Sequence, residues 1–184
     1  MRTIFLIFGL TILLVSCKTP EARKPVNTKS GSFLDESITR NKKLSAKEES
    51  RILKIIQKDT LNTYKASDGG FWYYYHTKDT VTTIQSPKFG DTVTFSYQLN
   101  DLNDNLIYSK KELDTIAYII DKEELFLGLR EGLKLMKPGE VITFLFPSYQ
   151  AYGYYGDDNK IGTNIPLKAK VTLHTINQES TLKN

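Results

Sequence analysis

One stretch, residues 121–153, restricts the fold of this chain more than any other part of the sequence. Asp121 and Glu124 have the spacing of a helix capping box, and the apolar residues behind them recur every three or four positions. This pattern predicts one short amphipathic helix. Gly128 and Gly132 lie four residues apart on this helix, so one of its faces has almost no side chains. Another segment of the chain can therefore approach the helix backbone closely.

A tight turn and a buried strand are predicted to follow the helix. The helix has to end before Pro138, because proline disfavours the helical conformation of the residue that precedes it. Pro138 and Gly139 suit the two central positions of a type II turn. Residues 141–146 then form an apolar run of strand length, rich in β-branched and aromatic side chains, and Pro147 ends it.

The composition changes at Tyr64, where the folded domain is expected to begin, because all 11 tyrosines lie between Tyr64 and Tyr155. Further strands are predicted at residues 71–76, 91–99, 106–108, 115–120 and 171–176. Together with the internal helix, these strands predict one domain of the α+β class over residues 67–178, followed by a tail at 179–184.

Several sequence elements occur in a specific order along this domain. They are G-x-x-x-G at 128–132, M-x-x-G-E at 136–140, the apolar strand 141–146, P-x-x-x-A-Y-G at 147–153, and Ile165-Pro166. In this order they resemble the FKBP-type peptidyl-prolyl cis-trans isomerases, over roughly residues 70–176. The resemblance implies an antiparallel β-sheet wrapped around one short α-helix, with a pocket between them. The whole chain also resembles the FKBP-type lipoproteins associated with gliding motility in Bacteroidetes.

The resemblance also implies which residues form the site. The catalytic residues would be Tyr97, Phe126 and Tyr152, with the Tyr152 hydroxyl and the Phe126 amide holding carbonyl groups of the substrate. The substrate-binding wall would consist of Ile107, Tyr108, Glu124, Leu125, Leu129, Ile165 and Leu173. Taken singly, an apolar residue of this set is more often part of a core than a ligand contact.

The expected reaction needs little chemical machinery. Amide resonance sets a barrier of about 18–20 kcal/mol to rotation about a peptide bond. The twisted transition state is less polar than the planar amide, so a dry pocket stabilises it without a nucleophile, metal or cofactor. We therefore expect an isomerase that acts on proline-containing polypeptides. It would assist the folding of periplasmic or outer-membrane proteins, including those of a gliding or secretion machinery.

The pocket of this chain departs from the family pattern. Leu129 stands where the family usually has tryptophan, and Ile107-Tyr108 stands where it has Phe-Asp. The loop between Tyr152 and Ile165 is also longer than the common form. Reduced isomerase activity is therefore expected. The alternative is a non-catalytic FKBP-fold domain that binds a partner within an envelope complex.

The N-terminus has the pattern of an export signal. Residues 1–16 combine Arg2, a short apolar run and a small-residue cleavage site, as in a secretory signal peptide. Residues 14–17 resemble the lipobox of bacterial lipoproteins, in which Cys17 is lipidated. With Lys18 next to this cysteine, the resemblance implies a lipid anchor at the periplasmic face of the outer membrane. A plain cleaved signal with an incidental cysteine is the alternative.

A tether and a helix are predicted ahead of the domain. Residues 17–44 are polar and almost free of aromatic side chains, which predicts a flexible tether. Ser45 and Glu48 repeat the capping-box spacing, so an N-terminal helix is predicted within residues 45–66. Its apolar stripe needs a partner surface. Docking onto its own domain and a homodimer through residues 45–60 both satisfy this need.

Charge and histidine content argue against other classes of function. The formal net charge of +4 is too small to indicate binding of nucleic acid. His76 and His174 are the only histidines, and neither has a cysteine or histidine nearby in the sequence, so no metal site is expected.

Overall fold

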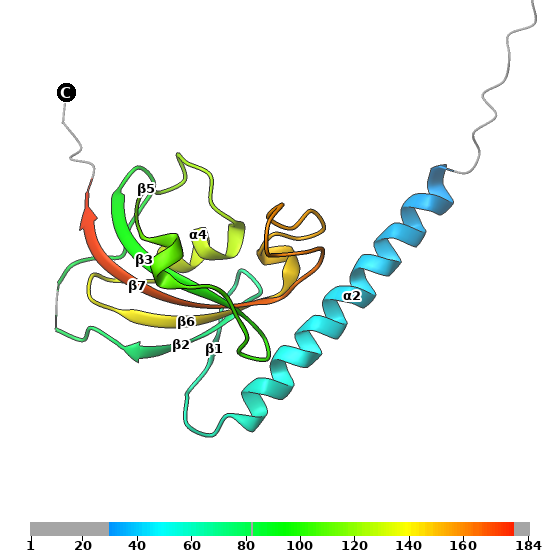
Figure 1. Cartoon of the computed structure of the whole chain (residues 1–184), viewed down its shortest axis with the longest axis horizontal. Coiled ribbons are helices and arrows are strands. Elements are labelled where there is room, and N and C mark those ends of the chain that lie inside the picture. The colour runs from blue at the N-terminus through cyan, green and yellow to red at the C-terminus, as the bar shows by residue number, and fades with distance from the viewer. Residues whose placement is uncertain (1–29, 82, 179–184) are drawn as a thin grey trace, which may run out of the picture. The chain divides into compact units, whose positions relative to one another are not determined.

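The computed structural model of the chain describes residues 30–81 and 83–178 (Figure 1). By its contacts the chain divides into residues 1–38 and residues 39–184. The helices are α2 (Ser30–Lys58), α3 (Lys110–Leu113) and α4 (Leu127–Leu133), with a 3-10 turn, η1, at Ser148–Gln150. The predicted signal peptide, the predicted lipidation site Cys17 and the predicted tail at 179–184 lie outside the described residues.

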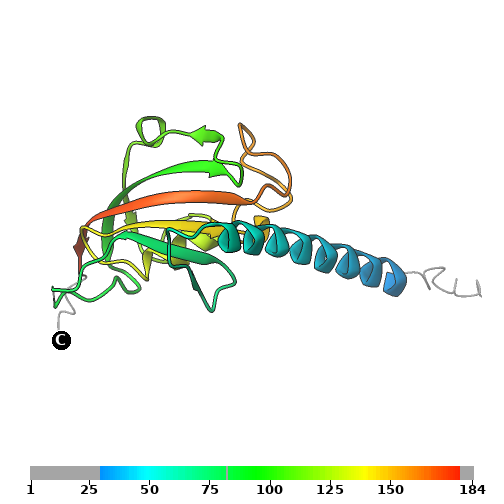
Figure 2. The same cartoon turned by 90° about the horizontal axis from the view of Figure 1, so that it is seen from below.

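All described strands belong to one antiparallel sheet. They are β1 (Lys65–Ala66), β2 (Trp72–Thr77), β3 (Thr92–Asp101), β4 (Leu106–Tyr108), β5 (Thr115–Ile119), β6 (Val141–Phe146) and β7 (Leu167–Asn177). The sheet order is β1-β2-β6-β7-β3-β4, and β5 also pairs with β3. The sheet curves around α4 (Figures 1 and 2), which confirms the predicted α+β architecture.

The glycine face of α4 packs directly on the aromatic side chains of β6. A Cβ atom on Gly128 would lie 2.5 Å from the Phe146 ring, and one on Gly132 would lie 3.0 Å from the Phe144 ring. The Phe144 and Phe146 rings themselves stack with centroids 5.5 Å apart. The close approach predicted from the glycine spacing is therefore confirmed, and its partner is the strand that follows the helix.

The predicted turn between α4 and β6 is also confirmed. The Glu140 amide donates to the Lys137 carbonyl at 3.1 Å, which closes the turn. Gly139 has φ +83°, as the third residue of a type II turn requires. The buried Glu140 carboxylate accepts a hydrogen bond from the Lys137 amide at 2.8 Å, so this side chain also fixes the turn.

The predicted start of this helix is wrong. α4 begins at Leu127 with Phe126 at its N-cap, and no side chain caps it. Asp121 has φ 59° and lies in a turn after β5, and its carboxylate is 3.2 Å from the Lys134 ammonium. The capping box of this region lies instead at Ser109 and Glu112, where it starts the unpredicted α3. Asp121 thus forms an ion pair with Lys134 instead of capping the helix, and Glu124 is exposed.

The predicted boundary between tether and helix is also wrong, because α2 begins at Ser30 rather than near Ser45. No glycine or proline interrupts residues 32–58, so a polar composition does not prevent a continuous helix here. Glu48 does not cap a helix. Its buried carboxylate accepts hydrogen bonds from the amide and the hydroxyl of Ser148, both at 2.8 Å.

The apolar stripe of α2 docks onto its own chain, which confirms the first of the two predicted modes. Ile52 is fully buried in a cluster with Leu102 and Leu145, and Ile55 and Ile56 pack against this cluster.

Within residues 30–81 and 83–178, no helix is long and apolar enough to span a bilayer.

We predict that Gly128→Ala destabilises the domain by about 1–3 kcal/mol, because the added methyl group overpacks the contact between α4 and β6. Thermal unfolding followed by circular dichroism measures the effect. Gly162→Ala is the matched control, because a Cβ atom at Gly162 meets nothing within 4 Å. Equal melting temperatures for the two variants would contradict the packing described here.

Candidate active site

A cleft of about 550 Å³ opens beside the first turn of α4. It is lined by Glu123, Glu124, Leu125, Phe126, Arg130 and Tyr152. The structure therefore brings together Glu124, Leu125, Phe126 and Tyr152 from the predicted site, although Tyr152 follows η1 and the others precede α4. Glu123 and Arg130 were not predicted, because neither belongs to the sequence motif.

The segment that leads into the cleft is held by Glu123. Its carboxylate accepts a hydrogen bond from the Ile119 amide at 2.8 Å, and its carbonyl accepts one from the Tyr118 hydroxyl at 3.2 Å. Tyr118 is buried in the core, so these contacts tie the segment before Phe126 to β5 and the core. On the far side of Phe126, Arg130 Nε lies 3.4 Å from Asp121, as an ion pair without a hydrogen bond.

The other predicted residues lie in the hydrophobic core on which this cleft is built. Tyr97, Leu129 and Leu173 are buried members of that core, at 5%, 0% and 0% exposure. Ile107, Tyr108, Leu125, Phe126, Tyr152 and Ile165 are partly buried and pack against it. All the predicted substrate-binding and catalytic residues except the exposed Glu124 therefore belong to one cluster.

Tyr152 presents an unused donor at this cleft. Its ring packs on Phe126 with centroids 5.1 Å apart. Burial, and then the neighbouring Tyr97, Asp157 and Tyr108, raise the pKa of the Tyr152 phenol, so the group stays protonated at neutral pH. Its hydroxyl makes no hydrogen bond to any group in the described part of the chain. The proton is thus available to a bound substrate.

Phe126 offers a second free donor, on the backbone. Its carbonyl accepts hydrogen bonds from the amides of Leu129 and Arg130, both at 3.1 Å, and so begins α4. Its ring packs edge-on against Phe146 with centroids 5.5 Å apart. The Phe126 amide itself donates to no group within residues 30–81 and 83–178. Helix and ring thus fix the position of an amide that is free to bind a carbonyl.

A carboxylate that the sequence did not reveal binds Tyr108, one of the predicted site residues. The short strand β4 ends in Tyr108 instead of an acidic residue, but the Tyr108 hydroxyl donates to Asp157 Oδ2 at 2.5 Å. Asp157 lies in the loop after Tyr152. Burial favours a higher pKa for Asp157, but hydrogen bonds from Tyr108 and from backbone amides outweigh it and lower the pKa. Tyr108 and Asp157 are 49 positions apart in the sequence, so no motif spacing could predict their contact.

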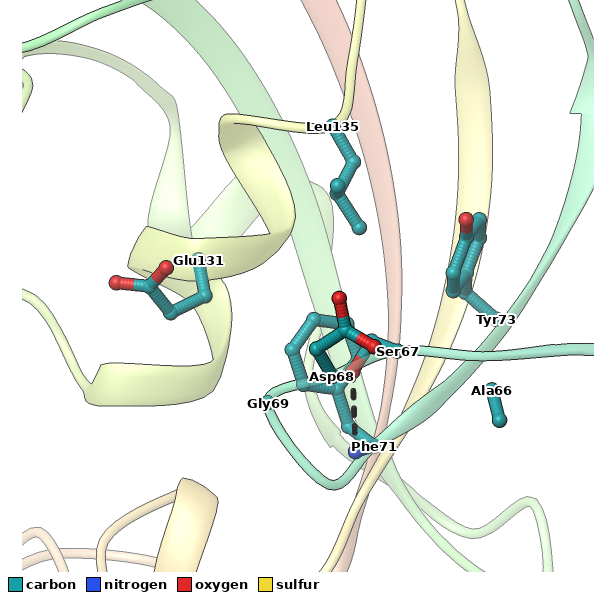
Figure 3. A pocket seen from close by; sticks show the side chains of 8 residues that line it. All are labelled: Ala66, Ser67, Asp68, Gly69, Phe71, Tyr73, Glu131 and Leu135. Carbon is teal, nitrogen blue, oxygen red and sulfur yellow. Dashed lines mark hydrogen bonds between the residues drawn. The ribbon is translucent and has the colours of Figure 1, made fainter.

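A second cavity, of about 310 Å³, contains none of the predicted site residues. Figure 3 shows Leu135 pointing toward the turn around Asp68 and the Phe71 ring, while the carboxylate of Glu131 points away from that turn. Within the described residues, no group of His, Cys, Asp and Glu side chains can hold a metal ion. The first cleft combines the apolar surfaces of Leu125 and Phe126 with the charged side chains of Glu123, Glu124 and Arg130 and the Tyr152 hydroxyl.

Residues 84–174 match the family model of the FKBP-type peptidyl-prolyl cis-trans isomerases. These residues therefore form a domain of the FKBP-type peptidyl-prolyl cis-trans isomerase class.

Two solved structures share the fold. A peptidyl-prolyl cis-trans isomerase from Pseudomonas syringae pv. tomato is 20% identical with a TM-score of 0.59, over 74% of this chain and 96% of that chain. FkpA from Escherichia coli is also 20% identical with a TM-score of 0.59, over 97% of this chain and 83% of that chain. No curated protein sequence matches the chain.

Proposed function

We propose that the cleft beside α4 catalyses cis-trans isomerisation of prolyl bonds in polypeptide clients. The observation that carries this proposal is a pair of donors at one cleft, the Tyr152 hydroxyl and the Phe126 amide, neither of which donates to a group in the described part of the chain. The two donors can hold carbonyl groups on either side of a prolyl bond, while Leu125 and the Phe126 ring exclude water from it. Because the twisted transition state is less polar than the planar amide, the apolar surroundings lower its energy more than that of the ground state.

The setting that we propose is the bacterial envelope. Residues 14–17 support a lipid anchor on Cys17 at the periplasmic face of the outer membrane, because they have the lipobox pattern. Clients in this compartment are periplasmic or outer-membrane proteins, including those of a gliding or secretion machinery. A homodimer through residues 45–60 stays a prediction; the burial of Ile52 within its own chain favours a monomer.

A non-catalytic FKBP-fold domain within an envelope complex is the second candidate. The observation that favours it is Leu129, which replaces the family's tryptophan and is fully buried, so it offers no surface to a substrate. Binding of a proline-containing peptide at the cleft without faster isomerisation would distinguish this candidate from the enzyme.

We predict that Tyr152→Phe lowers kcat/KM about fivefold, because it removes one hydrogen bond, worth about 1 kcal/mol, and leaves the ring in place on Phe126. A protease-free isomerisation assay on a proline-containing peptide measures the change. Tyr154→Phe is the control, since Tyr154 is 71% exposed and lies outside the cleft. Unchanged activity of Tyr152→Phe would exclude the hydroxyl as a substrate donor.

We also predict that kcat/KM stays constant from about pH 6 to pH 9. The pKa of Tyr152 is raised above the ordinary tyrosine value of about 10, mainly by burial, so its proton is lost only above that pH. The same assay over this range is the measurement. A loss of activity as the pH rises, with a midpoint well below 10, would show that another group supplies the donor.

A further inference from the structure

The loop between Tyr152 and Ile165 is bound to β4 and α3 by a set of polar contacts. Asp157 accepts the hydroxyl proton of Tyr108 at 2.5 Å, and the Lys160 amide donates to the same hydroxyl oxygen at 3.3 Å. The Lys160 ammonium pairs with Glu112 at 2.5 Å and lies 4.8 Å from the centre of the Tyr108 ring. Asp157 and Lys160, both in this loop, therefore contact the same residue, Tyr108.

The two oxygens of Asp157 perform different tasks. Oδ1 accepts hydrogen bonds from the amides of Asn159 at 3.0 Å and Ile161 at 2.7 Å, which sets the shape of the loop. Oδ2 binds Tyr108, which connects that shape to the sheet. Gly156 precedes Asp157 with φ +74°, and a Cβ atom on it would lie 2.2 Å from the Ile161 carbonyl. The backbone next to Asp157 is therefore closely packed.

Of the three phenols near the cleft, Tyr108 is the one whose proton is bound within the described chain, while Tyr97 and Tyr152 make no hydrogen bond there. The phenols of Tyr97, Tyr108 and Tyr152 are close enough to influence one another. A phenol has a single proton to donate, and that of Tyr108 is used on Asp157. Only buried surroundings and charge act on the Tyr152 hydroxyl, which has no partner in the described chain.

From these contacts we infer that Asp157 is a positioning residue for the isomerase reaction: by binding Tyr108 it fixes the loop beside the cleft and keeps the Tyr152 hydroxyl directed to the substrate. This inference rests on the proposed function and deepens it. Asp157 does not line the cleft, so it acts through Tyr108 and the loop rather than on the substrate itself.

Asp157→Asn tests this role, because the amide keeps the size and one acceptor but cannot offer two carboxylate oxygens. We expect kcat/KM to fall about fivefold, mainly through kcat with KM little changed, because the Tyr152 contact belongs to the transition state. Tyr108→Phe should give the same loss, and the double variant no more than either single one. Asp158→Asn is the matched control, since Asp158 is exposed and asparagine also tolerates its φ of 59°.

The decisive comparison repeats Asp157→Asn in a Tyr152→Phe background. A positioning role predicts no further loss there, because the hydroxyl to be positioned is gone. The full fivefold loss in that background, or normal activity of both Asp157→Asn and Tyr108→Phe, would overturn the inference.

If Asp157→Asn does not fold by circular dichroism, Tyr108→Phe decides alone, because it leaves the loop hydrogen bonds of Asp157 intact. An inactive wild-type chain would overturn the proposed function as well, whereas an active wild type with unaffected variants would overturn only the role of Asp157.

Discussion

The structure depends on the contact between the glycine face of α4 and the aromatic face of β6. Gly128 and Gly132 let the Phe146 and Phe144 rings reach the helix backbone, and no larger residue fits at Gly128 without displacing a ring or the Gln150 carbonyl. This contact fixes how closely α4 lies to the sheet. Because Phe126 stands at the N-cap of α4 and packs on Phe146, the same contact fixes the amide that we assign to substrate binding.

Two segments next to this contact form the cleft. One is the segment before α4, held to β5 by Glu123. The other is the loop after β6, which begins at η1 and carries Tyr152. That loop is held at its start by the buried Glu48 of α2, which binds Ser148, and farther along by Asp157, which binds Tyr108. Both segments that carry the donors are thus tied to other parts of the fold, by Glu123 at one side and by Glu48 and Asp157 at the other.

The sequence predicted the parts of the fold that depend on local pattern. The strand 141–146, the short strand 106–108 and the turn at Pro138-Gly139 all occur as predicted, because apolar runs and turn chemistry act over a few residues. The capping boxes at Asp121 and Ser45 failed, because tertiary partners for Asp121 and Glu48 outweigh a local spacing rule. The motif order selected residues that, apart from the exposed Glu124, lie in one cluster, but it could not find Asp157, whose partner is distant in the sequence.

The most direct test of the central claim is exchange spectroscopy by NMR on a proline-containing peptide mixed with the isotope-labelled chain. If the free donors at the cleft catalyse rotation, exchange between the cis and trans peptide signals accelerates, and the Phe126 amide signal shifts as the peptide is added. A shift of the Phe126 signal without faster exchange would contradict catalysis and leave a binding domain. Faster exchange with an unaltered Phe126 signal would place the reaction elsewhere on the molecule.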